Sequence, residues 1–424
     1  MATGIQNKTV ASVGASKGSG GNVRLSYDGK KSIEEILVGD QANISSVWRS
    51  FDSPMTGRLI WSENLTALRT LANDPKVKGK VRLVYIDPPF ATNSEFQSLD
   101  QTSAYSDYLQ GADFVEFLRE RLILIRELMA NDGSIYVHLD EKMIFEIKLV
   151  MDEVFGSTNY QNLITRKKCS TKNTTRKKYG NISDYILFYS KSKKFVWNRP
   201  YDPWPEEKIE KEYPCIDSSG RRFKKVPIHA PGVRNGETGQ PWRGKLPPAG
   251  KHWQVPPSKL DELDANGDIY WSATGNPRKK VYFDSSKGIP RQDIWLEYRD
   301  SINQNMKGTG YPTEKNLEML MEIIKASSNP GDLVLDAFCG SGTTLHAAQE
   351  LRRLWIGIDQ SPEAISCSLK RFTTGVEAMG DYVESNKATM TRGHQNLSCV
   401  IPSASFELQV SDEFREESQA LFGL

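Results

Sequence analysis

Three features are scarce in this 424-residue sequence: long apolar runs, cysteines and an excess of charge of one sign. No apolar run approaches the ~20 residues that span a bilayer, and the N-terminus shows no basic segment followed by an apolar core. The five cysteines are scattered and form neither a CxxC pair nor a Cys/His ligand spacing. These absences argue against a membrane span, a secretory signal, a zinc site and a disulfide framework, so we expect a protein of the reducing cytoplasm.

The net charge of +2 conceals an uneven distribution. No acidic residue lies between Glu153 and Asp184, whereas seven cations do. Such a run, interleaved with Thr, Ser and Asn, suits contact with the phosphates of DNA, although a solvated loop explains it equally well when it is considered alone. The predicted DNA-binding residues are Arg166, Lys167, Lys168, Lys172, Arg176, Lys177 and Lys178.

Composition divides the chain into five segments. Residues 1–30 are rich in Gly, Ser and Lys and are expected to form a flexible arm, and residues 376–424 form a C-terminal extension. Between them, residues 31–160 and 309–375 carry an α/β pattern, whereas residues 161–308 are loop-rich and hold six of the nine tryptophans. We therefore expect an irregular lobe inserted between two halves of one α/β domain.

Both halves show strands followed by helices. In the first, the apolar run 81–86 is stopped by prolines, as expected of a buried strand, and residues 113–128 carry apolar side chains at helical spacing. In the second, a strand over 332–336, a glycine-rich turn, a helix over 345–354 and a strand over 355–358 form half of a doubly wound nucleotide-binding sheet. The predicted fold class is α/β with a doubly wound, mostly parallel sheet.

The glycine-rich turn is the first candidate site. Gly340 and Gly342 would let a ligand approach the backbone, and Asp359, at the end of the next strand, could accept hydrogen bonds from two ribose hydroxyls. A plain turn or a dehydrogenase explains a lone GxG about as well. Leu345, however, replaces the third glycine of the dinucleotide motif, and Asp336 would repel a pyrophosphate but attract an ammonium group. This favours S-adenosylmethionine, which has an amino-acid tail and no phosphate.

The second candidate site is the tetrapeptide Asp87-Pro88-Pro89-Phe90, directly after a predicted strand. The exocyclic amino group of a base is a poor nucleophile because its lone pair is delocalised into the ring. The carboxylate of Asp87 and the carbonyl of Pro88 could accept its two hydrogens and direct the lone pair at the donor's methyl group. The prolines fix φ, and Phe90 offers a ring to a flipped base. The structural alternative is a proline turn followed by a core phenylalanine.

Together these motifs resemble the beta group of DNA amino-methyltransferases, in which the catalytic half precedes the cofactor half. The similarity spans roughly residues 55–375 and includes the segments LIWSENLTAL at 59–68 and SDYILFYSKS at 183–192. Residues 267–271, 277–284 and 292–298 are similar to segments of type III modification subunits and their shorter relatives. The resemblance implies the S-adenosylmethionine-dependent methyltransferase fold, an inserted target-recognition lobe, and methylation of the N6 amino group of a flipped adenine in double-stranded DNA.

The resemblance also implies roles for individual residues. The family usually has Tyr where Phe90 stands and Asp where Glu63 stands, so the second of these contacts is less secure. The implied catalytic residues are Asp87, Pro88, Pro89 and Phe90. In the donor site, Thr313 and Lys315 would hold the donor's carboxylate, Asp336 its amino group and Asp359 its ribose. Phe338 would pack on the donor, Glu63 or Asn64 would lie near its adenine, and Gly340, Gly342 and Thr343 would form the turn.

Other functions remain open at this point. An N4-cytosine methyltransferase would use nearly the same chemistry, but Asp rather than Ser at position 87 argues against it. Protein glutamine methylation uses a similar Asn-Pro-Pro motif, but Asp at position 87 and the large basic lobe disfavour it. A catalytically silent DNA-recognition subunit would not need the intact Asp87, Asp336 and glycine turn. The sequence leaves open whether the protein is a homodimer and whether a cognate restriction endonuclease accompanies it, and it indicates no membrane partner.

Overall fold

The computed structural model describes residues 25–50, 56–89, 111–170, 177, 179–300, 314–373 and 405–423, and the backbone alone of residues 95–97, 103–106, 307–308 and 377–378. The chain forms two compact units. The larger unit contains residues 1–198 and 293–424, and the smaller contains residues 199–292. In the described part, no helix is long and apolar enough to cross a membrane.

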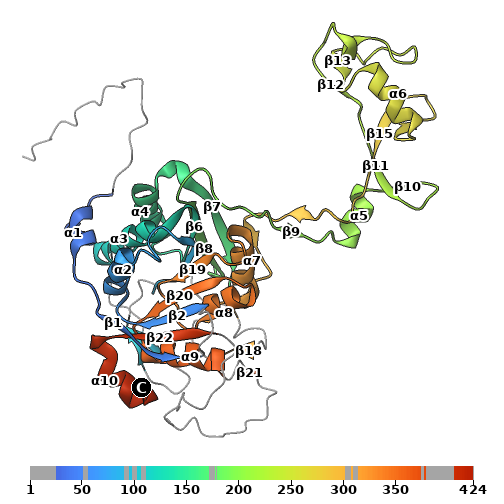
Figure 1. The fold of residues 1–424 in the computed structure, drawn as a ribbon. Helices are drawn as coiled ribbons and strands as arrows, with labels where there is room; N and C mark the ends of the chain where they lie inside the picture. Colours follow the sequence, from blue (N-terminus) through green and yellow to red (C-terminus); the bar gives the residue numbers. More distant parts are fainter. Residues whose placement is uncertain are drawn as a thin grey trace, which may run out of the picture. The chain divides into compact units, whose positions relative to one another are not determined.

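A ten-stranded sheet forms the centre of the larger unit (Figure 1). Its order is β1-β22-β2-β20-β19-β3-β6-β8-β7-β17, and the strands from β22 to β6 all pair in parallel. This confirms the predicted α/β class with a mostly parallel sheet. The strands are β1 (Ile44–Arg49), β2 (Gly57–Trp61), β3 (Val81–Ile86), β6 (Met129–Leu139), β7 (Tyr160–Lys167), β8 (Ser183–Ser190), β17 (Ile294–Trp295), β19 (Leu333–Asp336), β20 (Leu354–Asp359) and β22 (Phe406–Ser411).

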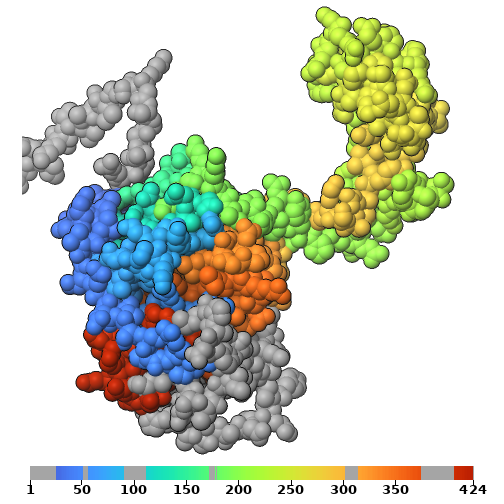
Figure 2. Space-filling model, in the orientation of Figure 1, coloured from blue at the N-terminus to red at the C-terminus, as the bar shows by residue number. Residues whose placement is uncertain are grey.

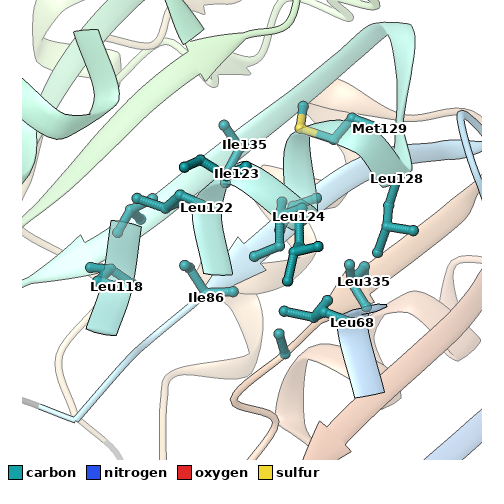
Figure 3. Packing of buried hydrophobic residues seen from close by; sticks show 14 of the residues in the cluster. Leu68, Ile86, Leu118, Leu122, Ile123, Leu124, Leu128, Met129, Ile135 and Leu335 are labelled. Atoms are coloured by element: carbon teal, nitrogen blue, oxygen red, sulfur yellow. The ribbon is translucent and has the colours of Figure 1, made fainter. Parts of the chain in front are cut away.

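Helices cover both faces of this sheet because the side chains of a strand alternate between its faces. In β3, Ile86 packs into one hydrophobic cluster with α2, α3 and α4, whereas Leu83 packs into a second cluster with α7, α8 and α9. In β19, Leu335 packs into the first cluster and Val334 into the second. Figure 3 shows Ile86 and Leu335 among the leucines of α3 and α2. The helices are α1 (Ile33–Val38), α2 (Asn64–Asn73), α3 (Gly111–Leu128), α4 (Ile144–Phe155), α7 (Leu317–Ser327), α8 (Thr343–Glu350), α9 (Pro362–Thr373) and α10 (Arg415–Phe422).

The smaller unit has its own sheet and core, and its surface is drawn in yellow-green in Figure 2. Four strands pair in the order β10-β11-β15-β14, and a second pair joins β12 to β13. Indole rings dominate the core, where Trp242 and Trp271 stack with centroids 5.2 Å apart. The elements are β9 (Tyr201–Asp202), α5 (Glu206–Glu212), β10 (Cys215–Ile216), β11 (Arg222–Val226), β12 (His229–Pro231), β13 (Lys251–Trp253), α6 (Pro257–Ala265), β14 (Ile269–Trp271), β15 (Pro277–Tyr282) and β16 (Ile289–Pro290).

The segment boundaries differ from those expected. The inserted unit spans 199–292 rather than 161–308, because β7 and β8 pair with each other and β8 pairs with β6 in the main sheet. The C-terminal extension is part of the same sheet, since β22 lies between β1 and β2. Of the expected arm, residues 1–24 lie outside the described part, whereas Tyr27 and Lys30 contact Glu116 of α3 and Glu153 of α4.

Candidate active site

Asp87 follows the last residue of β3 and therefore lies at the carboxyl edge of the sheet. Its side chain is 17% exposed, and its Oδ2 accepts a hydrogen bond from Nζ of Lys315, just before α7. Its Oδ1 is buried and has no hydrogen-bond partner among the described residues. Pro88 and Pro89 follow in the described chain, and Phe90 lies outside it. One oxygen of Asp87 is thus paired with a cation, and the other is available to a donor.

Asp336 ends β19, the parallel neighbour of β3, so its carboxylate lies at the same edge of the sheet as Asp87. The side chain is buried, and its Oδ1 accepts a hydrogen bond from the backbone N–H of Phe338 over 3.0 Å. The pKa of Asp336 is raised to about 7, mainly by burial; hydrogen bonds from Thr344 and Phe338 lower it, and the charges of Asp87 and Asp359 add to the rise. A cation placed against this carboxylate would stabilise its ionised form.

Asp359 ends β20, the next parallel neighbour, and it binds the glycine turn. Its two oxygens accept hydrogen bonds from the backbone N–H of Gly340 over 2.8 Å and of Ser361 over 2.9 Å. Burial raises the pKa of Asp359. Gly342 has φ 74°, and a Cβ there would lie 2.7 Å from Oγ of Ser368, so both conformation and space require glycine. Three adjacent strands therefore end in three carboxylates around a tight turn.

Glu63 and Asn64 begin α2 and help to hold this turn in place. Glu63 caps the helix through hydrogen bonds from the N–H groups of Leu65 and Thr66, each 2.9 Å. Asn64 donates to the carbonyl of Ala337 over 2.9 Å. The buried guanidinium of Arg121, on α3, donates to the side chains of both Glu63 and Asn64. These contacts connect two helices to the glycine turn.

Thr343 and Phe338 are also engaged in the turn. Oγ1 of Thr343 accepts a hydrogen bond from buried Arg371 over 3.2 Å, and Arg371 also donates to the carbonyl of Ser341 over 2.7 Å and pairs with Glu314. Phe338 is partly buried and contacts Phe117, with ring centroids 6.1 Å apart. The turn is thus held by α9 on one side and faces α3 through Phe338 on the other.

A chain of hydrogen-bonded polar groups begins at Tyr85, two residues before Asp87. The hydroxyl of Tyr85 lies 2.7 Å from Nδ1 of His138, for which the sequence suggests no partner, and Nε2 of His138 lies 3.0 Å from Asp184. Asp184 also pairs with Arg166 over 3.0 Å, and Arg166 donates to Asp300 and to the carbonyl of Tyr298. The charges of His138 and Arg166 hold the pKa of Asp184 well below its usual range, against burial, which is the largest influence and raises it.

This network corrects the role expected of Arg166. Its side chain is 0% exposed and is used in the interior, so it presents no charge to a phosphate. Lys167 and Lys168 are partly exposed, and Lys177 is exposed. Lys172, Arg176 and Lys178 lie outside the described residues, as does Thr313 of the expected donor site.

Sequence reasoning missed Arg121 and Arg371 as parts of the site. Both are buried cations on helices whose other buried residues are mostly apolar. Arg121 stands at an apolar position of the helical repeat at 113–128, and an arginine in such a stripe must have a buried partner. The partners themselves come from distant segments, so the pairing could not be read from spacing.

The fold and the three strand-end carboxylates define an S-adenosylmethionine-dependent α/β methyltransferase. The chain matches the DNA methylase family over residues 81–370, and it belongs to that family. It is 51% identical over 376 residues to the Type II methyltransferase M.EcaI of Enterobacter cloacae, covering 87% of this chain and 82% of the relative.

More distant relatives are also similar. The StyLTI Mod subunit, from a type III restriction-modification enzyme of Salmonella typhimurium, is 27% identical over 369 residues. That alignment covers 76% of this chain and 54% of the subunit, so the chain spans about half of that relative's length. The crystal structure of the M1.HpyAVI–SAM complex is 17% identical, with a TM-score of 0.41, covering 74% of this chain and 98% of that one.

The residues at the site fit the methyl donor of this family. Asp336 offers a buried carboxylate to an ammonium group, and Asp359 offers acceptor oxygens at the end of the neighbouring strand. The turn between them is tight, because Gly340 and Gly342 both have positive φ, the backbone conformation that favours glycine. Within the described residues, Oδ1 of Asp87 remains without a partner, as an acceptor awaiting a substrate hydrogen would.

Proposed function

We propose that this chain is a site-specific DNA methyltransferase that acts on the N6 amino group of an adenine turned out of double-stranded DNA. The observation that carries the proposal is Oδ1 of Asp87, which is buried and has no partner among the described residues, at the same sheet edge as Asp336 and Asp359. An acceptor in that position suits the amino group of a base, which can donate a hydrogen bond to it while lying next to the methyl donor.

The donor-binding part of the mechanism rests on Asp336 and Asp359. When bound, S-adenosylmethionine supplies a methyl group made electrophilic by its positively charged sulfur. We expect the carboxylate of Asp336 to be ionised when it holds the donor's ammonium group, because that cation offsets the burial that raises the pKa of Asp336. Asp359 already accepts two backbone N–H groups, and the remaining lone pairs of its carboxylate can accept ribose hydroxyls.

The substrate part of the mechanism rests on Asp87 and Pro88. Oδ1 of Asp87 can accept one amino hydrogen of the base, and the carbonyl of Pro88 the other, so that the nitrogen lone pair is no longer delocalised into the ring. Lys315 donates to Oδ2 and fixes the position of the Asp87 carboxylate, while Oδ1 is left for the base. After methyl transfer the nitrogen carries one proton too many, and Asp87 is the group placed to receive it.

The choice of adenine over cytosine rests on residue 87. An N4-cytosine enzyme would present the same fold and donor site, and the residue that differs is the first of the tetrapeptide, which is Asp in this chain. M.EcaI is named as a type II methyltransferase and StyLTI Mod as a subunit of a type III restriction-modification enzyme. We propose that this chain likewise protects DNA in a restriction-modification system.

The test is methyl transfer by Asp87→Ala. We expect incorporation of tritiated methyl groups from the donor into duplex DNA to fall by at least about 10²-fold, because the acceptor of the amino hydrogen is lost. DNA affinity should stay within about twofold of the wild type. Digestion of the wild-type product to nucleosides should place the label in N6-methyladenine.

The control variant is Asp74→Ala, whose carboxylate pairs with Arg58 at the far end of α2 and has no expected part in catalysis. It should methylate at the wild-type rate. Near-normal incorporation by Asp87→Ala would contradict the mechanism, and label recovered in N4-methylcytosine would replace adenine by cytosine as the target.

A further inference from the structure

The sheet of the smaller unit has two faces of different character. Strand register places Lys225 of β11 directly opposite Lys280 of β15, and Arg278 of β15 opposite Tyr270 of β14. Because residues two apart share a face, these four side chains lie on one side of the sheet. Phe223 and Tyr282, which also face each other, lie on the same side. We call this side the basic face.

Ring contacts confirm the assignment of side chains to the basic face. Nζ of Lys225 lies 3.6 Å from the ring centre of Tyr270, across the intervening strand β15. Nζ of Lys280 lies 5.5 Å from the ring centre of Phe223. The lysine ammonium groups and the aromatic rings therefore lie in one layer on this side of the sheet.

The opposite face of the same strands is covered. Arg222 pairs with Glu210 over 3.0 Å, and Lys224 pairs with Glu212 over 3.8 Å, both acids belonging to α5. Trp271 of β14 packs into the indole core of the unit. The charges of Arg222 and Lys224 are thus neutralised within the protein.

The basic face has no such neutralisation. Among the described residues, no carboxylate lies within ion-pair distance of Lys225, Lys280 or Arg278. Asp217 lies at the rim, where its carboxylate binds Ser219 and Arg221 of its own turn and the hydroxyl of Tyr282, two residues from Lys280. Two lysines directly opposite each other repel, so this arrangement favours binding of an anion.

We propose that the basic face docks the sugar–phosphate backbone of double-stranded DNA; the inference rests on the proposed function. Arg278 and Lys280 are two residues apart, about 7 Å along the strand, and Lys225 adds a second row. DNA carries its charge continuously on this scale, so neighbouring cations contact successive phosphates. An isolated anion would need only one of them.

The experiment compares two matched double variants of the full chain. The first variant, Lys225→Gln with Arg278→Gln, removes one lysine and one arginine from the basic face. The second, Lys224→Gln with Arg222→Gln, also removes one lysine and one arginine, but from the opposite face of the sheet. Affinity for a fluorescent mixed-sequence duplex is measured by anisotropy over a series of salt concentrations. We expect the log–log salt slope to fall by about 1.8 in the first variant, at ~0.9 per phosphate contact, and to be unchanged in the second.

A single Lys280→Gln variant should lower the slope by about 0.9 and provides a milder second measurement. Equal slopes for the two double variants would overturn the inference, and so would a loss confined to a single-stranded probe. If the wild type methylates duplex DNA in the same buffer and the slopes are equal, only this inference fails. If the wild type neither binds nor methylates the duplex, the proposed function fails with it.

Discussion

At the scale of single residues, the site is a group of acids crowded in a buried place. Asp336 is buried and Asp359, on the adjacent strand, is partly buried, and burial raises the pKa of both. The negative charges of Asp87 and Asp359 also make it harder to ionise Asp336. A site of this kind is unstable when it is fully ionised and gains from a bound cation, which is how we interpret its role in holding a positively charged donor.

The stability of the donor-free protein should report this strain. Burial raises the pKa of Asp336 in the folded protein to about 7, well above the 3.8 of an unperturbed carboxyl group. Unfolding therefore releases a proton in that window, and stability falls as pH rises through it. Asp336→Asn should remove this fall and raise the melting temperature at pH 8, by roughly 2–4 °C for each kcal/mol relieved.

The measurement is thermal unfolding between pH 5 and 8 without donor, and the comparison variant is Asp40→Asn. Asp40 is exposed, so its replacement should leave the wild-type pH dependence intact. A wild-type melting temperature that is flat over this range, or an equal change in both variants, would show that Asp336 is not strained.

At the scale of secondary-structure elements, the donor site depends on how helices are tied to the glycine turn. Arg121 connects α3 to the first turn of α2 through Glu63 and Asn64, and Asn64 connects α2 to Ala337. Burial lowers the pKa of Arg121 to about 10, against the charge of Glu63, which raises it. The guanidinium thus remains a cation at neutral pH, and its loss would leave two polar side chains without their donor.

Arg121→Met should destabilise the larger unit by about 1.5–3 kcal/mol, the cost of losing hydrogen bonds to a charged group. Affinity for S-adenosylhomocysteine, measured by calorimetry, should fall as well, because Asn64 is no longer held against the turn. The urea midpoint gives the stability change.

Arg126→Met, on the same helix but with 41% of its side chain exposed, is the matched control and should change stability by less than ~0.5 kcal/mol. If the two variants lose the same stability and bind the ligand equally well, the contacts of Arg121 do not support the donor site.

At the scale of the whole molecule, the chain leaves the main α/β unit after residue 198 and returns at 293. The two ends of the smaller unit pair with each other: β9 and β16 are antiparallel, with Asp202 opposite Ile289 and Tyr201 opposite Pro290. The smaller unit has a separate core and a separate sheet. We propose that donor binding and chemistry belong to the larger unit and that the smaller unit contributes the surface for DNA.

Replacing residues 203–288 by a short glycine-containing turn should therefore leave a folded protein. The ends to be joined are already neighbours in the β9–β16 pair, so little loop-closure entropy is lost. We expect the shortened chain to bind S-adenosylhomocysteine within about twofold of the wild type by calorimetry, while its affinity for duplex DNA falls by roughly tenfold or more because the basic face is removed.

The comparison is the intact chain, measured for both ligands in the same buffer. Loss of ligand binding together with loss of cooperative unfolding would show that the two units are one folding unit. Unchanged DNA affinity would contradict the assignment of the DNA-binding surface to residues 199–292.

The sequence was enough for the local features of the site. A strand stopped by prolines, and a strand followed by glycines and an acid, are contiguous patterns, so Asp87, Asp336 and Asp359 could be placed at strand ends before their partners were known. The class of the sheet followed from the same alternation of strands and helices, and the structure confirmed it.

What depends on contacts between distant segments came only from the tertiary structure. Arg166 was expected to meet DNA because charge in a sequence carries no information on burial, yet its partners Asp184 and Asp300 draw it into the interior. Likewise, β22 joins the sheet beside β2 across more than 300 residues, and Lys225 meets Lys280 only through the register of two strands. Short patterns specify a residue's own backbone, whereas its neighbours are chosen by packing and pairing of the entire chain.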